Sequence, residues 1–236
     1  MTRAVFLAFL GLSACTRAEA APPNPGAAGA TPILVELFTS EGCSSCPSAD
    51  AVATKLETTQ PVAGARVIVL AHHVDYWNQL GWPDPWSTSA ASQRQRAYGK
   101  GTYTPQAIVD GDAAMVGSGE GALTSAIAEA AKRPHSKVDL AVTAIDKTTF
   151  DVTVNASGDT FIAVVQDRGK VAVPRGENAG KTLEHTSIVR SLVNGPKARI
   201  TLPAAVNAPD GTGFSIVAFV VGKDKHVDGT AIAPAR

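Results

Sequence analysis

The chain has 236 residues, of which 44% are hydrophobic and 18% charged, with 21 basic side chains, 21 acidic side chains and three cysteines. The formal net charge of zero argues against a dedicated nucleic-acid-binding protein, which usually carries a basic surplus. The length suffices for one large domain or two small ones with a hydrophobic core, and three cysteines are too few for a disulfide-built scaffold.

Residues 1–20 have the order of features found in a secretory signal peptide. Arg3 supplies a positive charge, and an apolar stretch follows that is too short to span a bilayer. Two processing sites stay open: cleavage before Cys15, which would then be acylated as in bacterial lipoproteins, and cleavage after Ala20. Residues 21–31 are rich in Pro, Gly and Ala and are predicted to form a flexible tether. We therefore expect a periplasmic or secreted protein, anchored to the outer membrane through lipid if Cys15 is acylated.

From residue 32 onward the pattern alternates between strands and helices, which favours an α/β layer. Short apolar runs bounded by turn residues predict strands, and apolar residues at helical spacing predict helices. A hairpin is expected around Asp110-Gly111-Asp112, and its strands must be antiparallel because the turn is so short. The expected elements are strand 33–38, helix 47–58, strand 66–72, helix 85–98, strands 106–110 and 113–117, and a helix that Ser118 caps and Pro134 ends.

After Pro134 the pattern changes to strand-like alternation with turn signals between the runs. This pattern is typical of a small antiparallel sandwich or sheet. We therefore expect an α/β or α+β domain over residues 32–135, followed by an antiparallel β-rich, sandwich-like domain over 136–236. The strand-like runs are 138–143, 150–155, 161–166, 184–193, 198–202 and 214–221.

Two cysteines lie at the junction between strand 33–38 and helix 47–58, in the order Cys43-Ser-Ser-Cys46. This spacing lets one helical turn bring both sulfurs within disulfide range. Cys43 precedes or begins the helix, where free N–H groups and the helix dipole lower a thiol pKa, so we expect it to be the attacking nucleophile. Cys46, one turn in and more shielded, suits the resolving role. The pair predicts a redox-active disulfide with no further cofactor, acting on thiols and disulfides of partner proteins.

Two alternatives to a redox role stay open. The pair can form a purely structural disulfide, although so small a loop constrains the unfolded chain little. Zinc is disfavoured because the chain has no second cysteine pair. Adjacent strand residues His72 and His73 point to opposite faces and cannot easily serve one metal, so no metal site is expected, while copper capture with one of them stays a third reading.

The chain resembles the secreted thioredoxin-like proteins of a domain-of-unknown-function family found in bacteria and plants. The resemblance lies in VELFTSEGCSSCP at 35–47, HVDYW at 73–77, YTPQ at 103–106 and GENAG at 176–180, and it covers most of the chain after the signal. It implies a thioredoxin-like fold with a glutaredoxin-like minimal core, and little about activity, because the family is named for lacking one.

By wider resemblance to thioredoxin-like proteins, Cys43 is the nucleophile, Cys46 the resolving thiol and Pro105 a cis-proline, beside which the backbone of Thr104 docks substrate. The chain departs from thioredoxins at Gly42, where they have tryptophan, and in its Ser-Ser dipeptide, where they have Gly-Pro. Because that dipeptide tunes the reduction potential, oxidant, reductant and isomerase roles stay open.

Several other residues near the motifs have two interpretations. Tyr76 and Trp77, with Trp82 and Trp86 close behind, predict either a substrate-docking surface beside the thiols or a satellite hydrophobic cluster. Glu41 is either a surface carboxylate or a group that raises the thiol pKa of Cys43. No interacting residue can be assigned to His185 or Arg190 from the sequence, and both are expected to face solvent or a domain interface.

Overall fold

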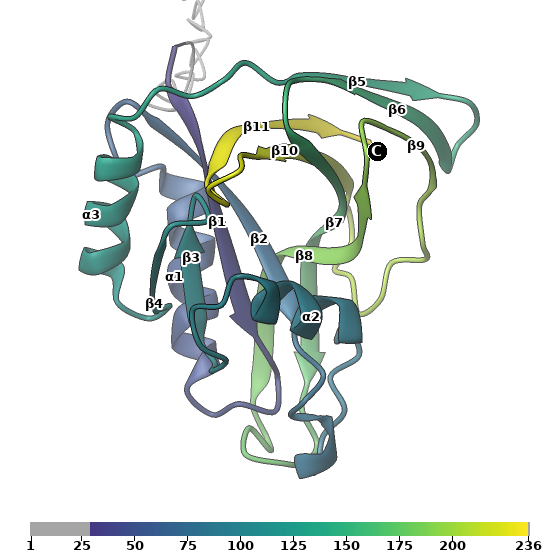
Figure 1. Cartoon of the computed structure of the whole chain (residues 1–236). Coiled ribbons are helices and arrows are strands. Elements are labelled where there is room, and N and C mark those ends of the chain that lie inside the picture. The colour runs from purple at the N-terminus through teal and green to yellow at the C-terminus, as the bar shows by residue number, and fades with distance from the viewer. Residues whose placement is uncertain (1–28, 236) are drawn as a thin grey trace, which may run out of the picture.

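A computed structural model describes residues 29–235 of the chain (Figure 1). The expected signal peptide, Cys15 and most of the tether lie outside this range, so those predictions are not tested here. Within the described range, no helix combines the length and apolar character needed to cross a membrane.

Eleven strands and three α-helices make up the described part of the chain. In chain order they are β1 (Thr31–Thr39), α1 (Cys46–Thr59), β2 (Ala65–His73), the 3-10 turn η1 (Asn78–Leu80), α2 (Ser89–Ala97), β3 (Gln106–Val109), β4 (Ala113–Val116), α3 (Glu120–Ala130), β5 (Asp139–Ala144), β6 (Thr149–Asn155), β7 (Asp159–Ala172), β8 (Thr182–Asn194), β9 (Lys197–Thr201), β10 (Phe214–Val221) and β11 (Val227–Pro234).

Eight of these strands form one mixed sheet, in the order β11-β10-β7-β8-β2-β1-β3-β4. β1 pairs in parallel with β2, and β2 in parallel with β8, whereas the remaining neighbours pair antiparallel. The antiparallel β3–β4 hairpin is confirmed. The other three strands form a small antiparallel sheet in the order β5-β6-β9.

The expectation of a small thioredoxin-like core followed by a separate β-rich domain is wrong. Four strands from the second half of the chain, β7, β8, β10 and β11, continue the sheet that β1 and β2 begin (Figure 1). The junction is the pairing of Ala71 in β2 with Ile188 in β8. The fold is therefore mostly β, and the sheet crosses the boundary that the change in pattern at Pro134 suggested.

Side chains of β1 alternate between two buried faces, which explains its nearly unbroken apolar sequence. Ile33, Val35 and Leu37 pack under α1 and α3, while Leu34 packs on the opposite face against strands of the second half. The sheet curls so that β11 comes close to β1, and the amide of Val227 donates to the carbonyl of residue 110. The small β5-β6-β9 sheet covers the remaining apolar face of β7 and β10.

Two helix starts differ from the expected positions for local reasons. α2 begins at Ser89 rather than near residue 85, because the side chain of Thr88 accepts a hydrogen bond from the amide of Ala91 and caps the helix there. α3 begins after Gly119, and Ser118 does not cap it. Both helices otherwise lie where the apolar spacing placed them.

Candidate functional site

Cys43 and Cys46 form a disulfide between the end of β1 and the start of α1, with their Cα atoms 5.4 Å apart. Cys46 is the first residue of α1 rather than one turn inside it, and Cys43 precedes the helix. The two cysteines are 1% and 0% exposed. The expectation that Cys46 is clearly more shielded than Cys43 is therefore not met. Ser44 and Ser45 between them are exposed, and the Sγ of Cys43 lies 3.4 Å from the Oγ of Ser45. Both sulfurs are therefore buried beneath an exposed two-residue loop.

The tip of the β7–β8 hairpin covers the disulfide loop. The side-chain amide of Asn178 donates to the carbonyl oxygens of Glu41 and Cys43, at 2.8 and 2.9 Å. The amide of Ser44 donates to the carboxylate of Glu177 at 3.0 Å, and this bond lowers the pKa of Glu177. A segment more than 130 residues downstream thus holds the backbone on both sides of Cys43.

Trp77 joins the disulfide loop to the segment before β3. Its indole N–H donates to the hydroxyl of Thr104 at 2.8 Å, and the Thr104–Pro105 peptide bond is cis, as predicted. A Cβ atom added at Gly42 would lie 3.1 Å from the Cβ of Trp77. A side chain in place of Gly42, such as the tryptophan of thioredoxins, would therefore displace Trp77. Tyr76 instead points to α2, where its hydroxyl donates to Gln95 at 3.1 Å.

Three titratable side chains from distant segments meet behind the disulfide. His185 of β8 is 4% exposed and has its Nδ1 3.6 Å from a carboxylate oxygen of Asp50 and its Nε2 3.7 Å from one of Glu41. Neither ring nitrogen has a hydrogen bond among the described residues, and neither does the Glu41 oxygen that faces it. Glu41 is fully buried, and its other oxygen accepts a bond from the indole of Trp82 at 2.5 Å. Glu41 is therefore not the surface carboxylate that its position allowed, and His185 does not face solvent.

A second buried pair lies against this group. His73 of β2 contacts the carboxylate of Asp84 at 2.7 Å, and the same carboxylate accepts the backbone amide of Glu41 at 2.9 Å. The rings of His73 and His185 meet edge to face, with centroids 4.8 Å apart, and Trp86 packs against both. Trp82 and Trp86 thus contact this buried site. They also belong to a separate hydrophobic cluster with Val171, Val173, Leu183 and Ile188, in agreement with the second interpretation of these tryptophans.

Burial and neighbouring charge shift the pKa values in this site. Removal from water and the charge of Asp84 raise the pKa of Glu41 to about 7. Burial lowers the pKa of His185, but the carboxylates of Asp50 and Asp84 outweigh it, so the net shift is upward. Burial likewise raises the pKa of Asp84, but the imidazole of His73 outweighs it and the net shift is downward. Glu41 and His185 therefore keep their protons to a higher pH than usual, whereas Asp84 loses its proton at a lower one.

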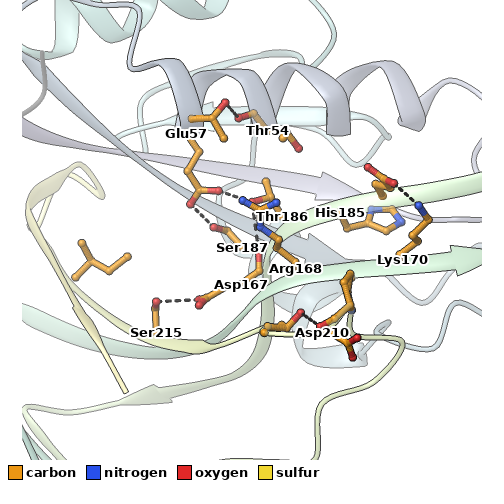
Figure 2. A pocket seen from close by; sticks show the side chains of 17 residues that line it. Thr54, Glu57, Asp167, Arg168, Lys170, His185, Thr186, Ser187, Asp210 and Ser215 are labelled. Carbon is orange, nitrogen blue, oxygen red and sulfur yellow. Dashed lines mark hydrogen bonds and ion pairs between the residues drawn. The ribbon is translucent and has the colours of Figure 1, made fainter. Parts of the chain in front are cut away.

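Two cavities border the site from the solvent side. One of about 770 Å³ lies between α1, the β7–β8 hairpin and the loop before β10, and Figure 2 shows His185 in its wall. In the same wall the carboxylate of Glu57 accepts the hydroxyls of Thr186 and Ser187 (Figure 2). A second cavity of about 400 Å³ is lined by Pro47, Asp50 and Glu184, among others. His185 and Asp50 thus each lie in the wall of a cavity beside α1.

The copper interpretation gains no support from the two adjacent histidines. The Nε2 of His72 lies 2.9 Å from buried Glu36, whereas His73 pairs with Asp84 on the other face of β2. Within residues 29–235, no group of three or more His, Cys, Asp or Glu side chains has the geometry to hold a metal ion.

His185 is the site residue that sequence reasoning missed. Periodicity assigned it to a strand, but nothing local indicated that β8 pairs with β2 and packs against α1. The available signal was its position five residues after the GENAG segment, 176–180, which matches the resembled family. Arg190, further along β8, donates to Gln166 of β7 at 2.5 Å.

Comparison with solved structures gives two similar chains. The X-ray crystal structure of a structural-genomics target from Agrobacterium tumefaciens matches with a TM-score of 0.64 and 26% identity, covering 89% of this chain and 97% of that one. HBP35 of Porphyromonas gingivalis matches with a TM-score of 0.54 and 17% identity, covering 87% and 76%. The second likeness shows the fold alone. No curated protein matches the chain. The family model for a protein of unknown function, DUF1223, matches residues 34–221, and the chain belongs to that family.

Proposed function

We propose that this protein is an exported thiol–disulfide oxidoreductase, or a redox relay, that uses the Cys43–Cys46 disulfide on thiols of partner proteins. The observation that carries the proposal is the disulfide of a two-residue loop at the N-terminus of α1, with a buried group of titratable side chains behind it. Export is part of the proposal, supported by the signal-like residues 1–20, and it supplies the oxidising compartment in which such a disulfide persists.

The surroundings of the two sulfurs support different roles for them. Cys43 lies before α1, and its sulfur contacts the hydroxyl of exposed Ser45, so we assign the attack of a partner thiolate to this sulfur. Cys46 lies at the N-terminus of α1, where free backbone N–H groups favour the thiolate that leaves when the bond breaks. Cys43 is therefore the proposed site of mixed-disulfide formation and Cys46 the resolving thiol.

The segment around Pro105 is the proposed docking surface for the partner chain. Trp77, held by Thr104, lies between Gly42 of the disulfide loop and the cis peptide before β3. Trp77 is only partly buried, so its ring offers apolar contact beside the reacting sulfur. Tyr76 precedes Trp77 in the same loop, and its hydrogen bond to Gln95 holds this loop against α2.

A second candidate function is a binding protein in which the disulfide is structural. The observation that favours it is the near-complete burial of both cysteines. Titration against glutathione buffers, with alkylated thiols counted by mass, separates the two. A reduction potential below about −300 mV is typical of structural bonds and would favour the binding protein.

Trapping in cells tests the assigned roles. A Cys46→Ser variant retains the attacking thiol and is expected to accumulate mixed disulfides with partner proteins through Cys43. The matched control is Cys43→Ser, which keeps only the buried resolving thiol and should trap none. Absence of mixed disulfides with Cys46→Ser, or an equal yield with both variants, would count against the relay.

A further inference from the structure

Reduction of the Cys43–Cys46 disulfide needs a source of protons, and the burial of both cysteines keeps bulk water away from the sulfurs. When a disulfide is reduced, the sulfur that leaves does so as a thiolate, and an anion without a partner in a buried site is unfavourable. Cys46 is 0% exposed, so water does not reach its sulfur directly. Free backbone N–H groups at the start of α1 favour the thiolate but do not protonate it, so forming the neutral thiol requires a titratable group inside the protein on the side of Cys46.

Asp50 is placed to exchange a proton with Cys46. It lies four residues further along α1, and residues at this spacing are neighbours on one face of a helix. Both side chains belong to the buried face of α1. Asp50 also lines the 400 Å³ cavity, so one carboxylate borders both the resolving cysteine and solvent.

His185 connects Asp50 to a second carboxylate. Its two ring nitrogens lie 3.6 Å from Asp50 and 3.7 Å from Glu41, and neither nitrogen has a hydrogen bond within the described residues. Buried polar atoms are normally paired, so two unpaired ring nitrogens call for an explanation, and a catalytic role is one of them. The charged and titratable groups that face His185 are Asp50 of α1, Glu41 of the β1–α1 loop, His73 of β2 and Asp84 of the loop before α2.

We propose that Asp50, His185 and Glu41 form a proton reservoir for the disulfide, in which His185 holds the proton that Asp50 passes to the thiolate of Cys46. The inference rests on the proposed redox function and deepens it. Asp50 is the proposed catalytic residue because α1 places it one turn from Cys46 on the same buried face. His185 and Glu41 act through Asp50 and are positioning residues.

A thiolate of a partner dithiol attacks the Sγ of Cys43, the S–S bond breaks, and its electron pair leaves on the Sγ of Cys46. That sulfur takes the proton that His185 releases through Asp50. Glu41 then returns a proton to His185, and the cavity beside Asp50 supplies one from solvent. The second partner thiolate attacks the mixed disulfide, and Cys43 leaves and takes a proton from solvent. The partner is oxidised to a disulfide, and this protein is reduced to two thiols.

The pH profile of reduction tests the reservoir. Asp50→Asn and His185→Gln keep side-chain size but cannot carry the proton, and His135→Gln, a buried histidine paired with Asp110, is the control. Reduction of the full chain by excess dithiothreitol is followed between about pH 5.5 and 8.5, where ionisation of the reagent affects every variant equally. General acid catalysis typically contributes 10²–10⁴-fold, so we expect both variants to react at least tenfold more slowly than wild type at the acid end, with the difference shrinking as pH rises. Wild-type profiles in both variants, or an equal change in His135→Gln, would overturn the proposal.

A measurement on the unmodified protein covers the case in which a variant fails to fold. With histidines labelled with ¹⁵N, the His185 ring is titrated by NMR in the oxidised and the dithiothreitol-reduced protein. The proposal requires its titration midpoint to differ between the two states, and identical curves would overturn it. A protein that resists glutathione and traps no partner refutes the redox function, whereas one that exchanges disulfides with unaltered pH profiles refutes the reservoir alone.

Discussion

At the scale of single residues, Glu41 has the least ordinary environment in the described chain. A carboxyl group is normally solvated, but this one is fully buried between the indole of Trp82 and the imidazole of His185. Its raised pKa follows from that burial and from the nearby charge of Asp84. The consequence is a stability that depends on pH near neutrality.

The stability of the protein is expected to fall as pH rises above the ordinary carboxyl pKa. The folded state keeps the Glu41 proton up to about pH 7, whereas the unfolded chain releases it near 4.5, so the folded state binds more protons in this window and its stability falls as pH rises through it. Glu41→Gln should reduce this decline by about 2 kcal/mol, measured by urea unfolding of the oxidised protein between about pH 5 and 8. If the free energy of unfolding of wild type and variant changed equally with pH, the burial of the Glu41 carboxyl group would be contradicted.

At the scale of elements, α2 is fastened to the sheet by one buried ion pair. The guanidinium of Arg94 donates to both carboxylate oxygens of Glu36 in β1, at 3.0 and 2.9 Å, and lies over the rings of Phe161 and Phe219. Burial alone would raise the pKa of Glu36, but the charge of Arg94 outweighs it and lowers the pKa well below its ordinary value. The helix therefore joins β1 to β7 and β10 of the second half.

Replacing the cation should destabilise the whole protein. Arg94→Met leaves the buried carboxylate of Glu36 with only His72 and the hydroxyl of Tyr98 as partners, and breaking a buried pair from one side typically costs about 3–5 kcal/mol. Arg96→Met on the exposed side of the same helix is the control and is expected to change the free energy of unfolding by less than about 0.5 kcal/mol. Equal effects of the two substitutions in chemical denaturation would show that the pair does not anchor α2.

The β7–β8 hairpin is expected to limit access to the disulfide. Asn178→Ala removes two buried hydrogen bonds to the backbone around Cys43, which together contribute about 1–2 kcal/mol. If the tip must lift before a reductant enters, reduction by dithiothreitol should become about five- to thirtyfold faster. The control is Arg175→Ala, an exposed substitution in the same loop. An unchanged rate in Asn178→Ala would mean that the reductant reaches Cys43 without displacement of the hairpin.

At the scale of the whole molecule, the curled eight-stranded sheet makes the two halves of the chain mutually dependent. Leu34, Ile68 and Leu70 of the first half form one core with Val165 and Phe219 of the second. On that face of β1 and β2 the first half supplies only α2, which packs against Phe38 and Ile108, whereas α1 and α3 lie on the other face. Strands of the second half cover Leu34, Ile68 and Leu70.

A fragment ending at the sequence-based boundary is therefore expected not to fold. Residues 32–135 alone would expose the apolar face of β1 and β2 and leave the β2 edge unpaired. We expect poor dispersion of amide signals in NMR and no cooperative thermal transition, in contrast to residues 29–236. A cooperatively folding fragment with its Cys43–Cys46 disulfide intact would show that the first half is an independent domain.

The sequence by itself determined the local features of this protein: the strand and helix order up to Pro134, the β3–β4 hairpin and the pairing of Cys43 with Cys46. These follow from apolar periodicity, turn residues and spacing, all of which act over a few residues. Only the tertiary structure decided that the second half extends the first sheet, that Asn178 covers the disulfide, and that His185 lies between Asp50 and Glu41. Strand pairing over more than 100 residues depends on which apolar faces remain uncovered once the helices have packed, and periodicity within a single segment carries no information about that.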